Sequence, residues 1–324
     1  MSGHGDEFRV ASWNVQHNGI DRDGSDRRRR VALGVLSRIR PHVVLRQEMT
    51  GAAAQGEHDR WAEAVHLGRR EERGADDPSR DDVPFVSYLA APKPDESPNP
   101  TGVFVDPVVC LPEGYYEHVA GVWHPICNPV VRIKGTETSL SVASFHLCYY
   151  DADQRAAEAR RLTTLGKPGM AAIIGGDCNS FPHRERDETT RLPDWTAVGD
   201  SSYYEHRTIE RDGQRVSDTR PDEILAGPRP GGQPPVFIEL GHYAATVLGQ
   251  RQALEPTASL WRTDQGERRR IDRIYVTPQL APALKRLEVI TTREVREASD
   301  HALVLATFQL SALRSALSPS SATP

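Results

Sequence analysis

The chain has 324 residues, and its 40 Lys and Arg residues against 45 Asp and Glu residues leave a formal net charge of −5. Hydrophobic residues make up 38% and charged residues 26%, which is ordinary for a globular protein and excludes disorder over most of the chain. The acidic balance argues against a general nucleic-acid coat protein, because non-specific affinity comes mainly from phosphate neutralisation by Lys and Arg. It leaves room for a local basic groove.

The sequence gives little indication of a membrane span, a signal peptide or disulfide bonds. No run approaches the roughly 18 consecutive apolar residues of a membrane-spanning helix, and residues 1–7 carry no apolar signal-peptide core. The four cysteines form no CxxC pair, so we interpret them as reduced and mostly buried thiols. We therefore expect a cytoplasmic protein without a membrane span, and we infer no obligate protein partner.

Taken in chain order, apolar runs and helical periodicities predict many strands and fewer helices. Strands are expected at residues 8–15, 43–45, 84–90, 102–110, 130–134, 139–147, 170–174, 270–276, 287–292 and 303–310. Helices are expected at residues 27–39, 52–67 and 154–165. This alternation favours an α/β protein in which two mixed sheets pack face to face with helices outside.

No linker divides the chain and no internal repeat is visible, so we expect one domain over residues 1–314. Insertions are expected near residues 68–82, which carry dense mixed charge without periodicity, and near residues 200–235, which are polar and rich in Gly and Pro. Residues 315–324 are mostly small or polar and are expected to form a flexible tail.

Several carboxylate, amide and imidazole groups lie in or at the end of an expected strand. They are Asn14, Glu48, His146, Asp177, Asn179, Asp272, Asp300 and His301. A carboxylate at the end of an apolar strand is costly unless a metal, a cation or hydrogen bonds satisfy it, so the recurrence suggests one shared site. Each residue alone can equally be structural. Hard oxygen donors of this kind suit Mg²⁺ or Mn²⁺ better than Zn²⁺.

The motifs that carry these residues occur in one order along the chain: SWNV at 12–15, QE at 47–48, FHL at 145–147, GGDCN at 175–179, RID at 270–272 and SDH at 299–301. In that order they resemble the endonuclease/exonuclease/phosphatase superfamily, which includes the exonuclease III-type and DNase I-like enzymes. The resemblance runs from about residue 10 to residue 308. It implies a four-layered α/β sandwich, two mixed β-sheets flanked by helices.

The resemblance also implies a metal site. Glu48 would be the principal Mg²⁺ ligand, with Mn²⁺ as an alternative metal. Asn14 and Asp300 would lie close to the metal and its waters.

Five further residues receive roles in hydrolysis from the resemblance. Asp177 would orient or deprotonate the attacking water, and Asn179 would hold the scissile phosphate. His301 would contact a phosphate oxygen, with Asp272 fixing its tautomer and favouring its charged form. His146 would lie near the leaving group.

Two departures from the family pattern and one Arg run remain. Cys178 stands where an aromatic or apolar residue is usual, and Arg46 replaces an apolar residue two positions before Glu48. A run of three arginines leads into Asp272: Arg268, Arg269 and Arg270. One of them is a candidate for substrate binding through a phosphate. A charge run of this kind can also simply be solvated.

We therefore predict a divalent-metal-dependent phosphoester hydrolase in which water attacks phosphorus in line. The first hypothesis for the substrate is DNA or RNA, cut by a phosphodiesterase or nuclease. The second is a small molecule or lipid head group, cut by a phosphatase or phosphodiesterase. The third, from another class, is a non-catalytic binding protein on the same fold.

Overall fold

Two six-stranded sheets form the centre of the computed structural model, which describes residues 6–54, 57–69, 82–93, 96–184, 187–188, 192–261 and 267–318. The first sheet contains, in spatial order, β13 (Leu284–Ile290), β14 (Leu303–Gln309), β1 (Glu7–Asn14), β2 (Val43–Gln47), β4 (Thr101–Val105) and β3 (Val86–Ala90). The second contains β11 (Ile238–Glu239), β12 (Asp272–Val276), β8 (Ala171–Asp177), β7 (Leu140–His146), β6 (Ile126–Ile133) and β5 (Cys110–His118). Parallel and antiparallel pairs occur in both sheets.

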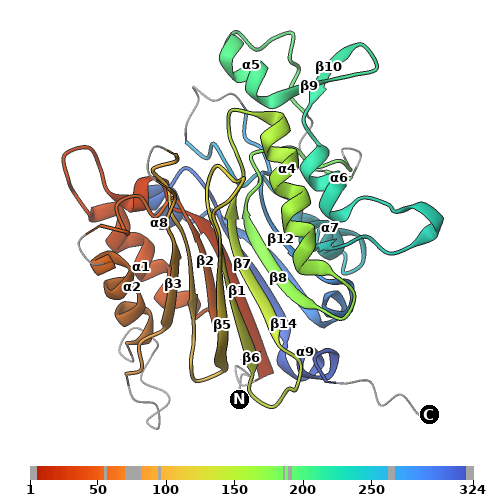
Figure 1. The fold of residues 1–324 in the computed structure, drawn as a ribbon. Coiled ribbons are helices and arrows are strands. Elements are labelled where there is room, and N and C mark those ends of the chain that lie inside the picture. The colour runs from red at the N-terminus through yellow and green to blue at the C-terminus, as the bar shows by residue number, and fades with distance from the viewer. Residues whose placement is uncertain are drawn as a thin grey trace.

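Helices cover the outer face of each sheet, as Figure 1 shows. The first sheet is covered by α1 (Arg27–Ile39), α2 (His58–Gly68) and α8 (Arg293–Ala298), and the second by α4 (Ala152–Leu162) and α6 (Arg220–Ala226). The remaining helices are α5 (Ser201–Arg207), α7 (Leu240–Thr246) and α9 (Leu310–Ala316). A separate hairpin pairs β9 (Thr208–Arg211) with β10 (Gln214–Ser217). The predicted four-layered sandwich is confirmed.

Short 3₁₀ helices complete the described part of the chain. They are Gln16–Gly19, Thr163–Gly166, Pro230–Gly232, Arg251–Leu254 and Pro278–Ala283. None of the helices in the described residues is both long and apolar enough to cross a lipid bilayer.

The alternation of side chains along each strand separates the buried residues into an inner core and two outer cores. Val10 of β1 faces the core between the sheets, whereas Trp13 packs outward beneath α1. In the second sheet, Ile173 faces the inner core and Ile174 packs outward near α4. A strand that is buried on both faces reads as a continuous apolar run, which is why β8 was recognisable in the sequence.

The strand register brings the polar strand ends together at one edge of the sandwich. β1 and β2 are parallel, and Asn14 pairs with Gln47, the residue before Glu48. β7 and β8 are also parallel, and there His146 pairs with Asp177. β12 runs antiparallel to β8, so that Asp272 at its start also pairs with Asp177.

Some predicted boundaries are wrong. The helix expected at residues 52–67 begins only at His58, and the strand expected at 102–110 is divided between β4 and β5. Residues 200–235, expected as a polar insertion, contain α5, the β9–β10 hairpin and α6. Of the insertion expected at residues 68–82, the part from 70 to 81 lies outside the described residues.

The expected flexible tail begins too early. Residues 315 and 316 belong to α9, and Leu317 is 0% exposed. The carbonyl of Leu317 accepts a hydrogen bond from the backbone N–H of Thr138, at 3.0 Å. A single apolar side chain therefore anchors a segment whose composition is otherwise that of a tail. Residues 319–324 lie outside the described residues.

Candidate active site

Glu48 follows β2 with a left-handed backbone, at φ +53°, which turns its side chain toward the end of β1. Its Oε1 accepts a hydrogen bond from Asn14 Nδ2 at 3.1 Å, and its Oε2 accepts one from the backbone N–H of His17 at 3.0 Å. Burial raises the pKa of Glu48, but His146, the His17 amide and His301 outweigh it and hold that pKa below its ordinary value. Glu48 is therefore a partly buried carboxylate that stays ionised.

Two oxygen atoms of the expected metal-binding residues are buried without a hydrogen-bond partner among the described residues: Oδ1 of Asn14 and Oδ1 of Asp300. Leaving such acceptors unsatisfied is costly, and a cation is one way to satisfy them. Together with the Glu48 carboxylate they form an all-oxygen donor set. That set fits a hard divalent cation such as Mg²⁺ or Mn²⁺.

Asp177 ends β8 at the centre of the site. Its Oδ2 accepts a hydrogen bond from Asn14 Nδ2 at 3.3 Å, and lies 3.5 Å from His146 Nε2 and 4.0 Å from His301 Nε2. Its Oδ1 accepts the backbone N–H of Asn179 at 2.8 Å. Burial raises the pKa of Asp177, but the two imidazoles and the Asn179 amide outweigh it, so this pKa is lowered.

Asn179 follows Asp177 on the same loop, in a left-handed conformation at φ +47°. Its Nδ2 donates to the carbonyl of Leu147 at 2.9 Å, which fixes the amide plane. The left-handed backbone lets both Asp177 and Asn179 face the site from positions only two residues apart. Asn is one of the few non-glycine residues that adopt this conformation readily.

His301 and Asp272 form a buried ion pair. His301 Nδ1 lies 2.9 Å from Asp272 Oδ2 and 3.1 Å from Oδ1. Burial lowers the pKa of His301, but Asp272 first, and then Asp300 and Asp177, raise it to about 10. Burial and the nearby Asp177 charge raise the pKa of Asp272, and the ion pair with His301 opposes them. At neutral pH the pair is an imidazolium beside a carboxylate.

Possible ligand atoms of Asp177, Asp272 and His301 all lie within 4.8 Å of one another, a spacing that a metal ion could use. Asp272, however, already binds His301 Nδ1 with both oxygens. A charged imidazole would also repel a cation. We therefore interpret this cluster as an imidazolium facing a carboxylate, and place the candidate metal on the Glu48 side.

Sequence reasoning missed His124. Its ring stacks on that of His146, with centroids 4.1 Å apart and planes at 11°. His124 Nδ1 makes a short contact with Ser97 Oγ, and its Nε2 is buried without a partner among the described residues. Burial first, and then His146, hold the pKa of His124 well below its ordinary value. His124 lies before β6 in no motif, so no sequence signal pointed to it.

The three arginines before Asp272 lie in different surroundings. Arg270 is buried in ion pairs with Glu188 at 2.6 Å and Glu239 at 3.1 Å. Its guanidinium is therefore committed to the fold, which corrects the expectation that it could bind substrate. Arg268 is exposed, and Arg269 is buried over the ring of Tyr203, 4.9 Å from its centroid.

Arg46, the departure beside Glu48, is buried. Its Nε donates to Glu63 Oε1 of α2 at 2.9 Å, and its Nη1 donates to the carbonyl of Trp13 at 3.1 Å. The side chain thus ties the ends of β1 and β2 to the covering helix. Its charge is matched within the fold and does not reach the site.

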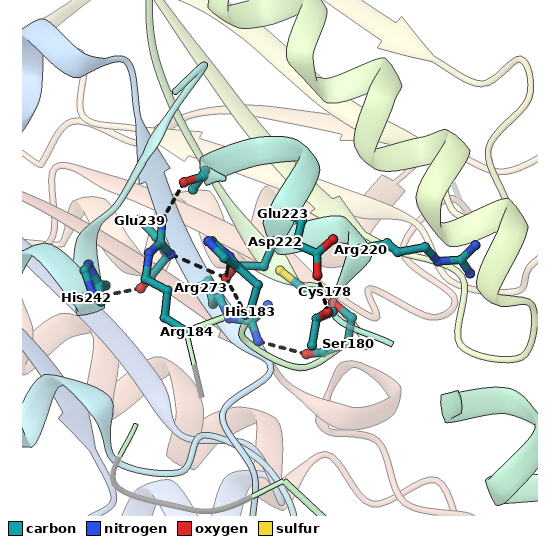
Figure 2. Close-up of polar contacts among 12 residues, drawn as sticks. Cys178, Ser180, His183, Arg184, Arg220, Asp222, Glu223, Glu239, His242 and Arg273 are labelled. Carbon is teal, nitrogen blue, oxygen red and sulfur yellow. Dashed lines mark hydrogen bonds and ion pairs between the residues drawn. The ribbon is translucent and has the colours of Figure 1, made fainter. Parts of the chain in front are cut away.

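A second polar network joins the loop after β8 to α6 and β12, and Figure 2 shows Ser180, His183, Asp222 and Arg273 within it. Asp222 of α6 accepts hydrogen bonds from the Tyr275 hydroxyl at 3.0 Å and from the backbone N–H of His183 at 3.0 Å. Arg273 Nη2 donates to the carbonyl of Ser180 at 2.9 Å. Burial raises the pKa of Asp222, but His183 and Arg273 outweigh it and hold that pKa far below its ordinary value. This network fixes the loop that carries Asp177 and Asn179.

Solved structures with a similar fold include three proteins of low sequence identity. D. rerio TDP2 in complex with a single-stranded DNA product is 17% identical, with a TM-score of 0.56, covering 93% of this chain and 98% of that one. An AP endonuclease from Archaeoglobus fulgidus is 14% identical, with a TM-score of 0.57, covering 93% and 99%. ANGEL2, a 2′,3′-cyclic phosphatase, is 12% identical, with a TM-score of 0.58, covering 94% and 95%. These likenesses show the fold.

No curated protein matches the chain by sequence. The Endonuclease/Exonuclease/phosphatase family matches residues 11–301, a span that begins before Asn14, ends on His301 and contains every residue of the site described above. By this match over nearly the whole chain, the protein belongs to the endonuclease/exonuclease/phosphatase family.

Proposed function

We propose that the protein is a divalent-metal-dependent phosphodiesterase whose substrate is a polynucleotide. The observation that carries the proposal is the meeting of an ionised Asp177, a charged His301 and the Glu48 donor set at one edge of the sandwich. Unlike the ion pairs that tie the fold together elsewhere, this cluster includes polar atoms without a partner among the described residues. It is the arrangement expected where charge develops on phosphorus.

Glu48, Asn14 and Asp300 would hold Mg²⁺, with Mn²⁺ as an alternative. A divalent ion supplies positive charge to phosphoryl oxygens during the reaction. The chain's contribution is the rigid placement of the donors, since the Asn14 amide also hydrogen-bonds Glu48 and Asp177.

The other side chains of the site would transfer protons and stabilise the charge that develops on the phosphate. Asp177 is ionised and accepts a proton from the attacking water as the new oxygen–phosphorus bond forms. Charge that builds on the phosphoryl oxygens is met by the His301 imidazolium and the amide of Asn179. The ester oxygen leaves with the electron pair of the broken bond and takes a proton from His146 or from solvent.

One observation favours a diester over a monoester: the structurally similar D. rerio TDP2 was crystallised in complex with a single-stranded DNA product. The likeness to the 2′,3′-cyclic phosphatase ANGEL2 keeps a phosphatase as the second candidate. We further propose that the chain acts as one domain that includes α9 and Leu317, and that the protein is cytoplasmic.

The test is hydrolysis of bis-p-nitrophenyl phosphate and p-nitrophenyl phosphate by the purified protein with Mg²⁺, with Mn²⁺ and with EDTA, beside a plasmid and a short RNA. Metal-dependent cleavage of the diester and of a polynucleotide is the expected result. Cleavage of the monoester alone would replace the proposal with a small-molecule phosphatase. Equal cleavage in EDTA would contradict the proposed dependence on a divalent metal.

A further inference from the structure

Arg207, the last residue of α5, reaches from the 200–235 insertion to the loop that carries Asp177 and Asn179. Its Nη1 donates to the carbonyl of Asn179 at 2.6 Å. Figure 1 shows α5 beyond the ends of β7 and β8, on the side of the molecule where the strand ends converge. The insertion thus places a guanidinium directly beside the candidate site.

The Arg207 guanidinium makes no side-chain ion pair within 4 Å with a described residue, and its Nε is buried without a hydrogen-bond partner among them. Burial lowers the pKa of Arg207 to about 10 and the charges of Arg155 and Arg269 add to this, whereas Tyr203 and Asp177 oppose it. A buried donor without an acceptor is costly, and an anion would satisfy it.

A second guanidinium lies on the same aromatic ring. Arg207 is 5.6 Å and Arg269 is 4.9 Å from the centroid of Tyr203. Arg269 comes from the segment just before β12, which carries Asp272, and is 6% exposed. Two guanidinium groups gathered on one ring, next to the loop of Asp177, form a pre-organised set of planar hydrogen-bond donors.

We propose that Arg207 and Arg269 form a second phosphate-binding subsite, which takes a phosphate of the substrate adjacent to the scissile one. The inference rests on the proposed function and deepens it, because a subsite of this kind selects substrates that carry more than one phosphate. A polynucleotide backbone has such a phosphate at every step. Charge-assisted contacts of this type are worth about ten- to a hundredfold in kcat/KM.

The test uses matched substrates that differ only in the second phosphate: thymidine 3′-(p-nitrophenyl phosphate) with and without a 5′-phosphate, and thymidine 5′-(p-nitrophenyl phosphate) with and without a 3′-phosphate. In the unaltered protein the second phosphate should raise kcat/KM about tenfold or more in at least one pair. Arg207→Gln and Arg269→Gln should remove that gain. Arg207→Lys, which keeps the charge, should retain part of it.

Arg211→Gln is the matched control. Arg211 lies on the adjoining strand β9 and is partly exposed, and it pairs with Glu223 at 3.0 Å. It should leave the gain unchanged. A purely structural role of Arg207, through Asn179, would slow both members of a pair equally and keep their ratio. That result, or no gain in either pair, overturns the subsite.

A binding measurement tests this inference independently of the proposed catalytic function. If the protein cleaves none of these esters, the proposed function fails, but the anisotropy of a labelled oligothymidylate still tests the subsite. Arg207→Gln should then weaken binding about tenfold and reduce the slope of log affinity against log salt by about one. Equal affinity for the variant and the unaltered protein overturns the subsite.

Discussion

Replacing Asp272 by Asn removes the charge that keeps His301 protonated, and the expected consequence is an altered pH dependence. The two side chains are buried and lie 2.9 Å apart. Asn has nearly the same shape and can still accept the Nδ1 proton of His301. The variant therefore isolates the electrostatic effect of Asp272 from its role in positioning the ring.

The magnitude follows from the pKa of His301, which is about 10 in the folded protein against an ordinary value of 6.5. In Asp272→Asn, burial still lowers the pKa of His301, and the charges of Asp300 and Asp177 still raise it. We therefore use the ordinary pKa of 6.5 as the reference value for His301 in the variant. About three quarters of His301 would then be charged at pH 6 and about one thirtieth at pH 8, whereas the unaltered protein stays fully charged. Asp177, whose pKa is lowered, remains ionised throughout.

The assay is kcat/KM for bis-p-nitrophenyl phosphate between pH 6 and pH 8, read after quenching into alkali. The activity of Asp272→Asn relative to the unaltered protein should rise about twentyfold as the pH falls over that range. Stability gives a second readout, because a raised His pKa stabilises the fold fully below pH 6.5 and this contribution is lost as the pH rises through about 10. A relative activity that is constant with pH would refute the reasoning.

Three further substitutions test the metal site, a buried ion pair and the C-terminal anchor. Glu48→Gln should eliminate the rise in melting temperature that Mg²⁺ gives the unaltered protein, and an equal rise in the variant would contradict the ligand assignment. Glu63→Gln leaves the Arg46 charge buried without its partner and should cost about 3–5 kcal/mol in urea unfolding; a cost below about 1 kcal/mol would show that the pair is not needed. Leu317→Ala should cost about 2–5 kcal/mol by the same method, whereas a flexible tail would give no change.

The sequence was sufficient to predict the sheets and the polar strand ends, for a physical reason. Strands such as 139–147 and 170–174 are buried on both faces, so their apolar runs stand out. Parallel pairing then places the residues that end neighbouring strands at the same edge, and His146 and Asp177 meet in this way. The family resemblance added the roles of these residues but did not change which of them converge.

Contacts between distant segments could not be predicted in the same way. The stacking of His124 on His146 depends on how the loop before β6 folds over the strand ends. The approach of Arg207 to Asn179 depends on the path of the 200–235 insertion, whose polar composition fixes no direction. Arg269 and Arg270 are neighbours in sequence but have different partners. Arg270 forms an ion pair with Glu188, whereas Arg269 lies over the ring of Tyr203.

The central claim is that Asp177 and a divalent ion hydrolyse phosphodiesters together, and one comparison tests it most directly. Initial rates with bis-p-nitrophenyl phosphate would be measured for the unaltered protein, for Asp177→Asn and for Asp212→Asn, each with Mg²⁺ and with EDTA. Asp212 is exposed on the turn between β9 and β10, at φ +53°, a conformation that Asn also adopts readily, so it is the matched control. The account predicts Mg²⁺-dependent hydrolysis by the unaltered protein and by Asp212→Asn, and a loss of about a thousandfold in Asp177→Asn. Hydrolysis that survives in Asp177→Asn, or that EDTA does not reduce, would contradict it.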